Sequence, residues 1–574
     1  MKKYLFIALA ALGFAACAEK VDDTNVPKGE LEESYIAINL MAADVDTRAV
    51  TDDIGNADEY GYELGTDAER KINSAYFFFF NEDGDPFLVT PHQDGGAQGP
   101  AQTGNNYLPL NISDGSTSNM DNVSDIRNAV LVLNTYKGVY PSKIVAVLNW
   151  TPTNNSYSLS ELHVQLADLV GVDGGFVMSN SVYMDGAYEV VDAVPLTAAN
   201  IKTTAEEAKA EPVDIYVERV AAKVVLTASG KVSSSDQIVV FDTEKNSSPI
   251  TTLGAANDID VYVQIHGWEL YNDYDDSPLL KNIDNWPIAD LGLTWNDIPY
   301  YRSYWANQRT DTVEDSFSWS YSQKDGETNT YSGFPTEHGF AVGHTTYCGE
   351  NTKQGKRTKV ILKGQLLQKT DGLYENLSLA RWYGTEYAGN EALRTAVANS
   401  LKYTLYSSTD GQTYTAITPG DIVCVSGVPG AESYEVGFHL STTGEDKVWY
   451  KYSSARGYET MGDVANGDNK LKTNTYLETV EPALLYEHGQ TYYYVDIEHL
   501  GAVGKTAEYG VVRNHVYQID IESIKGYGSP IYSALDFIVE QPEYPTEDEA
   551  SYVAARINVL SWKVVKQGVN IETK

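Results

Sequence analysis

The sequence predicts a mainly β protein with two β-sandwich domains and a few short helices. Short runs with strand character recur along the chain, and turns rich in Gly, Asn and Asp separate them, as in β-sandwich domains. Only two segments have the apolar spacing of a helix. At 574 residues the chain is long enough for several such domains.

The expected strands occur throughout the chain. In the first half we expect strands at residues 35–41, 75–80, 143–149, 213–217 and 223–226. In the second half we expect them at residues 261–265, 359–362, 491–497 and 516–521. No internal repeat of solenoid period is visible.

Two helices are predicted. The first spans residues 158–170, where Ser158 and Glu161 can form a capping box and one face carries Leu159, Leu162, Leu166 and Leu169. The second spans residues 390–401, with Leu393, Val397 and Leu401 at helical spacing.

The N-terminus has the pattern of an export signal. Two lysines follow Met1, and residues 4–14 form an apolar stretch too short to span a bilayer. Two alanines then precede Cys17, which predicts cleavage by a lipoprotein signal peptidase and lipidation of Cys17. The alternative is an ordinary secretory signal with an incidental cysteine. No other stretch has the apolar length of a membrane helix.

Composition excludes some classes of function. The chain has 80 acidic and 41 basic residues, a formal charge of −39, which repels phosphate backbones and argues against nucleic acid as a partner. Its 42 tyrosines suit half-buried strands and contact surfaces. Three cysteines are too few for a disulfide framework; Cys348 and Cys424 either pair or stay buried and free.

The two ends of the exported chain contain complementary features. Near the N-terminus, the expected strand at 35–41 is followed by a polar loop with a single basic residue, Arg48, as in a protease-sensitive site. Near the C-terminus, an acidic connector at 540–549 leads into a β-rich run at 556–571. A head strand that proteolysis can remove and a tail strand that can extend are what a polymer formed by strand addition requires.

The apolar residues of this C-terminal run change face partway along it. One face carries Leu560, Trp562 and Val564. The other carries Ile557, Val559, Val565, Val569 and Ile571. The change indicates a bulge or a strand that is buried on both sides.

Catalytic or metal-binding motifs are weak in this sequence. His344 and Cys348 have no further ligands near them, whereas a zinc site needs about four. The acidic segments 81–85 and 273–276 are expected to be solvated turns, with incidental calcium as the alternative. The sequence lacks a phosphate-binding loop, a nucleophile elbow and a His-Glu-x-x-His motif. We therefore expect no enzyme activity and no cofactor.

One longer motif carries a family resemblance. Residues 509–530 contain Arg513-Asn514-His515, then a Tyr two positions on, leading into a strand. Weaker similarities lie at residues 176–180, 217–223, 301–306 and 347–352. In order and spacing, these segments resemble the fimbrillins that form the stalk of short (minor) fimbriae, the type V pili of Bacteroidales. We expect the three motif residues to fix a turn.

The resemblance implies transthyretin-like Greek-key domains and a maturation route. Such subunits are exported as lipoproteins to the outer membrane and cut after an Arg by an Arg-specific protease, which here implies cleavage between Arg48 and Ala49. They then polymerise head to tail in a cell-surface fimbria by donor-strand exchange, which supports adhesion and colonisation. The implied donor strand is the C-terminal run. The implied partners are other copies, anchor and tip subunits, the protease, and host or bacterial receptors.

The expected organisation has five parts. They are a signal peptide with the lipidated Cys at 1–17, a propeptide with the removable strand at 18–48, β-sandwich domains at 49–219 and 220–539, and a linker with the donor strand at 540–574. An anchor subunit would not need a terminal donor strand, and no binding module for a tip role is visible. A surface lipoprotein that binds glycans remains the alternative.

Overall fold

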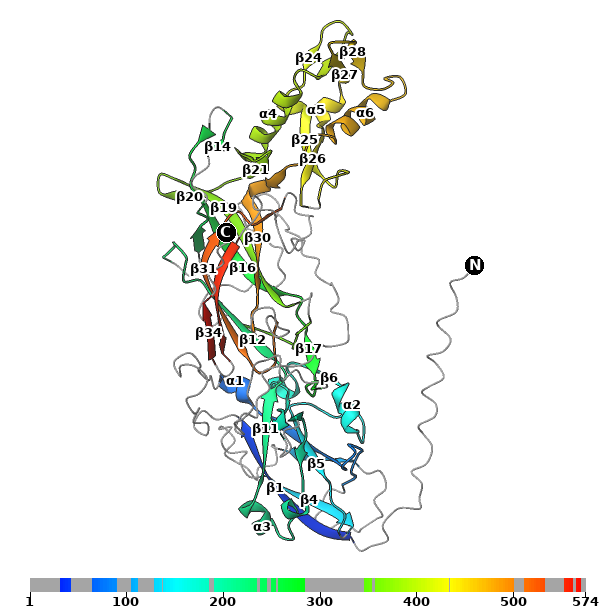
Figure 1. Ribbon diagram of the computed structural model, residues 1–574, viewed down its shortest axis with the longest axis vertical. Coiled ribbons are helices and arrows are strands. Elements are labelled where there is room, and N and C mark those ends of the chain that lie inside the picture. The colour runs from blue at the N-terminus through cyan, green and yellow to red at the C-terminus, as the bar shows by residue number, and fades with distance from the viewer. Residues whose placement is uncertain are drawn as a thin grey trace, which may run out of the picture.

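The computed structural model describes residues 31–42, 65–89, 105–111, 129–136, 138–184, 190–234, 238–244, 249–253, 256–283, 345–353, 357–432, 434–499, 510–531, 552–560 and 564–568. Several predicted residues lie outside these ranges: Cys17, Arg48, Ala49, His344, Trp562, Val569 and Ile571. The described part is mainly β, with a few short helices and three hydrophobic cores arranged along one long axis (Figure 1). Among its helices, none has the length and apolarity needed to cross a membrane.

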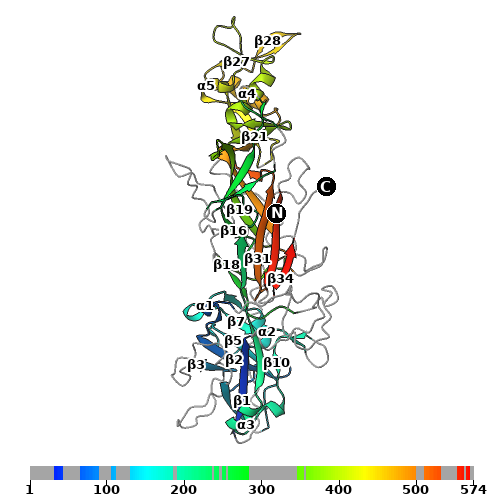
Figure 2. The same ribbon diagram turned by 90° about the vertical axis from the view of Figure 1, so that its left-hand side faces the viewer.

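The first core lies at the lower end of the molecule in Figures 1 and 2. Its main sheet has the strand order β3-β2-β5-β7-β11-β1-β4. The bounds are β1 Leu31–Ala42, β2 Ser74–Phe80, β3 Tyr107–Asn111, β4 Ala129–Tyr136, β5 Lys143–Leu148, β7 Met178–Asn180 and β11 Val213–Arg219. Short elements around this sheet are α1 Asp67–Arg70, β6 Leu166–Asp168, β8 Tyr183–Met184, β9 Val190–Val191, β10 Val194–Pro195 and α3 Ala205–Ala210.

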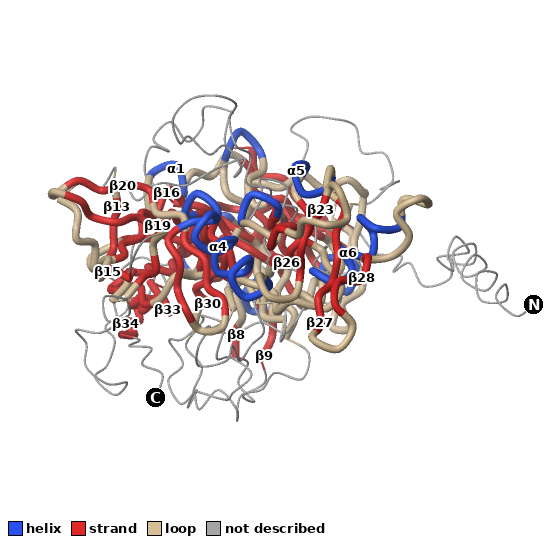
Figure 3. Tube along the Cα trace, turned by 90° about the horizontal axis from the view of Figure 1, so that it is seen from above, coloured by secondary structure: helices blue, strands red, loops and turns tan. Residues whose placement is uncertain are grey.

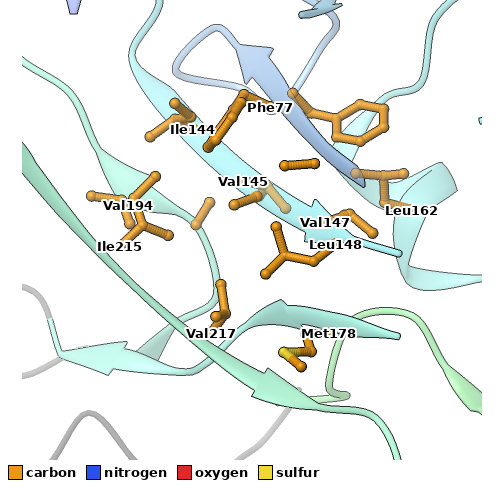
Figure 4. Close-up of a cluster of buried hydrophobic side chains, with 14 of the residues drawn as sticks. Phe77, Ile144, Val145, Val147, Leu148, Leu162, Met178, Val194, Ile215 and Val217 are labelled. Atoms are coloured by element: carbon orange, nitrogen blue, oxygen red, sulfur yellow. The ribbon is translucent and has the colours of Figure 1, made fainter. Parts of the chain in front are cut away.

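The central strands of this sheet are covered on both faces. β2 and β5 are continuous apolar runs rather than alternating ones, because side chains on both of their faces are buried. Figure 4 shows Phe77 of β2 and Ile144, Val145 and Val147 of β5 within the core, with Ile215 of β11 nearby.

The second core lies between two sheets. One has the order β18-β12-β31-β33-β34, with bounds Thr345–Cys348, Ala222–Thr227, Val516–Lys525, Tyr552–Leu560 and Val564–Gly568. The other has the order β13-β16-β19-β30-β32, with bounds Val239–Asp242, Val261–Tyr271, Lys359–Thr370, Gln490–Asp496 and Ser529–Pro530. β20 Leu373–Asn376 pairs with β19. Both sheets contribute side chains to one buried cluster, as in a β-sandwich.

A third core, which the sequence analysis did not predict, lies at the upper end of the molecule in Figure 1. It is built from residues 380–485. In the sequence these residues lie between strands of the second core; the first core with its sheet is called the first unit below, and the second core with its two sheets the second unit. Its elements include the helices α4 Gly389–Leu401, α5 Thr442–Glu445 and α6 Asp468–Leu477, all visible from above in Figure 3. The strands are β23 Leu405–Ser408, β24 Thr415–Ala416, β25 Ile422–Ser426, β26 Val436–Leu440, β27 Val448–Ser453 and β28 Gly457–Thr460. A sheet with the order β15-β14-β22-β21-β29 lies next to this core, with bounds Ala256–Asn257, Ile250–Thr251, Thr385–Ala388, Leu379–Trp382 and Leu484–Tyr486.

One predicted helix is confirmed and the other is mostly wrong. α4 buries Leu393, Val397 and Leu401, as their spacing predicted. α2 is only Leu159–His163, although its capping box between Ser158 and Glu161 forms. The chain beyond it becomes β6, because residues 166–168 pair with β17 Asp276–Pro278.

The two cysteines within the described residues, Cys348 and Cys424, are buried and free. Burial raises the pKa of the Cys348 thiol well above its ordinary value. Burial raises the pKa of the Cys424 thiol to about 12, against a smaller opposing effect of Arg394. Both thiols therefore stay protonated and act as small apolar side chains.

Candidate strand-exchange site

The predicted head strand, now β1, lies inside the first sheet. It pairs in parallel with β11, from Ile38 opposite Val213 to Ala42 opposite Val217. It pairs antiparallel with β4, from Leu31 opposite Tyr136 to Ile38 opposite Ala129. A further antiparallel bridge joins the backbone of Tyr35 to that of Lys202, which lies shortly before α3 in the sequence. β1 therefore has strand neighbours on both of its edges.

β4 depends on β1 for its place in the sheet. In the sheet order, β4 is an edge strand, and within the described residues its only strand partner is β1. Removing β1 would leave β4 without its ladder and would expose the edge of β11. A row of unpaired N–H and C=O groups of this kind accepts another strand.

The side chains in the middle of β1 belong to the first core. Ile36 and Ile38 are fully buried, and Ala37 is 1% exposed. Each isoleucine is worth about 1.5–3 kcal/mol on burial. Loss of β1 would therefore leave an apolar groove as well as open backbone edges.

The predicted tail strand forms a hairpin on the second unit. β33 pairs antiparallel with β31, from Val516 opposite Leu560 to Lys525 opposite Tyr552. β34 folds back on β33, with Leu560 opposite Val564, and forms the outer edge of the sheet. Residues 561–563, between these two strands, lie outside the part of the chain that the structure describes.

The predicted donor residues that the structure describes lie in this hairpin. Ile557 is opposite Ile519, and Val559 is opposite Tyr517 on one side and Val565 on the other. The run was expected to be one strand, whereas the structure folds it into two antiparallel strands.

Arg513 of the family-like motif connects the two large units. Its side chain is fully buried, with Nε 3.3 Å from Glu350 Oε2 and Nη2 donating to the carbonyl of Pro278 at 2.6 Å and to Ser277 Oγ at 3.4 Å. Nη1 donates to the carbonyl of Leu279 at 3.3 Å. Arg513 thus holds the segment 277–279, which β6 of the first unit also pairs.

The expected turn at this motif is present. Asn514 has a left-handed backbone with φ of 57°, which Asn tolerates better than most residues, and its N–H donates to the carbonyl of Ala221 at 2.7 Å. The Nδ1 of His515 lies 2.8 Å from the carbonyl of Arg513. The motif predicts the turn but not the contacts of Arg513, because Glu350 and residues 277–279 are far away in the sequence.

Two further buried ion pairs lie at this junction. Lys281 Nζ is 3.0 Å from Glu218 Oε1, and both side chains are almost completely buried. Burial lowers the pKa of Lys281, against the opposing effect of the Glu218 and Glu350 carboxylates. Leu279 and Leu280, next to Lys281, pack in the first core.

The second pair joins α1 to the second unit. Lys223 Nζ on β12 is 2.9 Å from Glu69 Oε1, and the Tyr347 hydroxyl on β18 donates to the same oxygen at 2.6 Å. Burial tends to raise the pKa of Glu69, but hydrogen bonds from Tyr347, Lys223 and the Thr66 N–H outweigh it and hold that pKa below its usual value. Three buried charged groups therefore join the units at this junction: Arg513, the Lys281–Glu218 pair and the Lys223–Glu69 pair.

Asp273, near this junction, gives a pH-dependent prediction. Burial raises its pKa to about 6, with Asp275 and Glu269 adding repulsion. A carboxyl whose pKa is higher in the folded state than in the unfolded state stabilises the fold at low pH, and this contribution is lost as the pH rises from about 4 through 6. We expect Asp273→Asn to increase stability at pH 7.5 by about 1–3 kcal/mol and to leave it almost unchanged at pH 4.

The measurement is chemical denaturation of both proteins at several pH values. The matched control is Asp371→Asn, since Asp371 lies in an exposed turn. Equal pH dependence of the wild type and Asp273→Asn would contradict the prediction.

Among the described residues, no group of three or more His, Cys, Asp or Glu side chains is placed to hold a metal ion. The described part is a mainly β protein, and its candidate site consists of β1 and the tail hairpin of β33 and β34.

A family match agrees with this class of protein. Residues 484–568 match the family described as major fimbrial subunit protein type IV, fimbrillin, C-terminal. The matched span contains the Arg513 turn, β31 and both strands of the tail hairpin. The C-terminal part of the chain is therefore similar to the C-terminal region of the fimbrillins, which are subunits of fimbriae.

Solved structures of fimbrial proteins are distantly similar. A fimbrilin from Porphyromonas gingivalis is 12% identical, with 91% of this chain and 96% of that chain covered and a TM-score of 0.33. The tip fimbrial protein from the same organism is 10% identical, with 92% and 99% covered and a TM-score of 0.28. A fimbrial assembly protein from Parabacteroides distasonis is 9% identical, with 74% and 100% covered and a TM-score of 0.27.

No curated protein matches the chain.

Proposed function

We propose that this protein is a stalk subunit of the short-fimbria type, and that it polymerises by donor-strand exchange after proteolytic removal of β1. The observation that carries the proposal is the position of β1, which lies between β11 and β4 with Ile36 and Ile38 fully buried. A strand that completes its sheet in this way leaves a defined groove when it departs.

The cleavage site lies close to this strand in the sequence. Arg48 follows the last residue of β1, Ala42, by six positions. A cut between Arg48 and Ala49 by an Arg-specific protease would separate β1 and the lipidated Cys17 from the rest of the chain. The precursor would reach the outer membrane as a lipoprotein, and the cut subunit would join the fimbria.

The C-terminal hairpin is the proposed donor. The 20 residues from 532 to 551, which join it to the second unit, can span at most about 65–70 Å when extended. That reach allows the tail of one subunit to enter the first sheet of the next. Burying five or six apolar side chains there is worth on the order of 10 kcal/mol before the entropy cost.

The place of the tail on β31 gives the precursor a protected state. Pairing with β31 on one side and β34 on the other satisfies both backbone edges of β33 within its own subunit, so β33 is not free to pair elsewhere before a groove opens. In the fibre, the same tail would exchange this edge for the groove of a neighbour. Head-to-tail contacts of this kind build filaments rather than closed rings.

The test is the effect of Arg48→Ala on maturation. Because the Arg-specific cut is lost, we expect the variant to stay as a lipidated precursor that forms no polymer. Intact mass, N-terminal sequencing and a non-boiled gel after treatment with an Arg-specific protease give the readout. The wild type should yield a new N-terminus at Ala49 together with a ladder of oligomers.

Two controls sharpen this test. Arg48→Lys keeps the positive charge but not the protease specificity, so it should behave like Arg48→Ala. Lys28→Ala removes another basic residue of the propeptide and should mature normally. Normal fibres from Arg48→Ala would remove the cleavage step from the mechanism, and a cut wild type that stays monomeric would favour an anchor or tip subunit.

A further inference from the structure

The four-stranded sheet of the third core has the order β24-β23-β27-β28 and two chemically different faces. The inner face packs on the third core through Leu405 of β23 and Trp449 of β27, which are both fully buried. Successive residues of a strand point to opposite faces, so the residues next to these two lie on the outer face.

The outer face is formed by tyrosines from three strands. Tyr406 of β23 is opposite Tyr450 of β27, and Tyr452 of β27 is opposite Tyr458 of β28. Tyr414, just before β24, joins them by stacking on Tyr458 with ring centres 3.7 Å apart and planes within 3°. These five residues are called the tyrosine face below.

The rings of the tyrosine face support one another. Tyr458 also lies 5.1 Å from Tyr406 and 4.9 Å from Tyr452, and Tyr414 meets Tyr450 edge-on at 5.1 Å. Tyr452 and Tyr458 nevertheless remain 37% and 39% exposed. The face is therefore an ordered array of rings that still presents aromatic surface to solvent.

Strand positions on this face carry no charge. The charged pair across β27 and β28, Lys451 and Glu459, lies at the alternate positions, and the Lys451 ammonium is 4.8 Å from the ring of Tyr476. The nearby Asp410 carboxylate accepts bonds from the backbone N–H groups of Gln412 and Thr413, at 2.8 and 2.7 Å. The outer strand positions thus hold rings, hydroxyls and small apolar groups only.

We propose that the tyrosine face binds a neutral glycan. Phenol rings stack on the C–H faces of pyranoses while their hydroxyls hydrogen-bond to the sugar, and Tyr provides such contact at a low cost in side-chain entropy. An uncharged face on a chain of formal charge −39 is matched to a neutral ligand and disfavours an anionic one.

The size of the face also favours a small ligand. A fully exposed aromatic side chain presents about 150–250 Å², so the exposed parts of Tyr452 and Tyr458 amount to roughly 150 Å². A stable protein–protein interface needs about 800 Å² on each partner. The face fits one or two sugar rings better than a second subunit.

The test uses the full chain on an array of immobilised neutral oligosaccharides of glucose, galactose, mannose and N-acetylhexosamines, beside sialylated and sulfated counterparts. Retention by neutral glycans is expected. Tyr452→Ala and Tyr458→Ala should each weaken binding about tenfold, and Tyr458→Phe should weaken it less because the ring remains. Tyr383→Ala is the matched control, since Tyr383 is 70% exposed but lies outside the face.

Thermal unfolding of each variant separates lost binding from lost folding. Tyr458 contacts three other rings, so Tyr458→Ala is the variant whose folding is most at risk. If that variant misfolds, Tyr452→Ala still tests the proposal. Three results would overturn the proposal: no neutral glycan retained, retention of charged glycans only, or unchanged binding by a folded Tyr452→Ala. Protection of the face from tyrosine nitration in fibres but not in monomers would also overturn it, because the face would then be a subunit contact.

Discussion

A chain that ends at Glu549 is expected to be cut after Arg48 like the wild type and yet to remain monomeric. The truncation removes β33 and β34, so no donor is left for the groove of a neighbouring subunit. Because a polymer of this kind needs one donor for each contact, the expected effect is complete loss of the oligomer ladder on a non-boiled gel.

A graded variant and a rescue distinguish this effect from misfolding. Trp562→Ala should weaken polymerisation without unfolding the subunit, whereas Lys566→Ala, which removes a charged residue of β34, should assemble normally. A synthetic peptide of residues 550–574 should bind to the cut, truncated chain. Fibres from the truncated chain, or normal fibres from Trp562→Ala, would count against the tail as donor.

Substitution of Arg513 is expected to have the largest effect on stability. Arg513→Met leaves the Glu350 carboxylate and the carbonyls of Pro278 and Leu279 buried without their donor. Removing one partner of a buried, hydrogen-bonded ion pair costs about 3–5 kcal/mol. Chemical denaturation should show this loss in the free energy of unfolding.

Two variants serve as controls for that measurement. Adding Glu350→Met to Arg513→Met should recover part of the loss, because no uncompensated carboxylate then remains. Lys525→Met breaks an ion pair with Glu244 in which both side chains are substantially exposed, so its effect should stay below about 1 kcal/mol. An effect this small for Arg513→Met would show that the junction does not depend on its ion pair.

The strands of this fold follow from local patterns in the sequence. The apolar run at 75–80 and the alternating run at 516–521 became β2 and β31, because period and composition alone distinguish such strands from helices. Residues 166–168 show the limit of such patterns. Their leucine spacing suits a helix, but pairing with residues 276–278 makes them a strand. A partner so distant in the sequence cannot be recognised from the local pattern.

The third core escaped prediction for a related reason. Its strands have the same Tyr-rich, turn-punctuated composition as the strands around them, so no change in the sequence marks the insertion of residues 380–485. Only α4 was visible in advance, through Leu393, Val397 and Leu401. The tyrosine face is equally hidden, since strand pairing brings its five rings together.

The candidate site could be predicted in part from the sequence. The strand character of residues 35–41 was clear, but its neighbours in the sheet were not, because β4 and β11 lie about 90 and 175 residues further along the chain. The turn at Arg513 was predicted from its motif. Its bond to Glu350 was not, since a lone Glu in so acidic a chain carries no information about its partner.

The pairing of β1 with β11 would also constrain the passage of the chain across a membrane in the proposed export. β1 precedes its partners in synthesis, so the first sheet cannot close until Arg219 has emerged. Formation of the second core is delayed further, because β12 pairs in parallel with β31 and Lys223 cannot pair with Val516 until that residue has been synthesised. Contacts of such long sequence separation form slowly. The unclosed chain can therefore be threaded through a translocation pore before it folds, and its first groove is filled by β1 as soon as that groove exists.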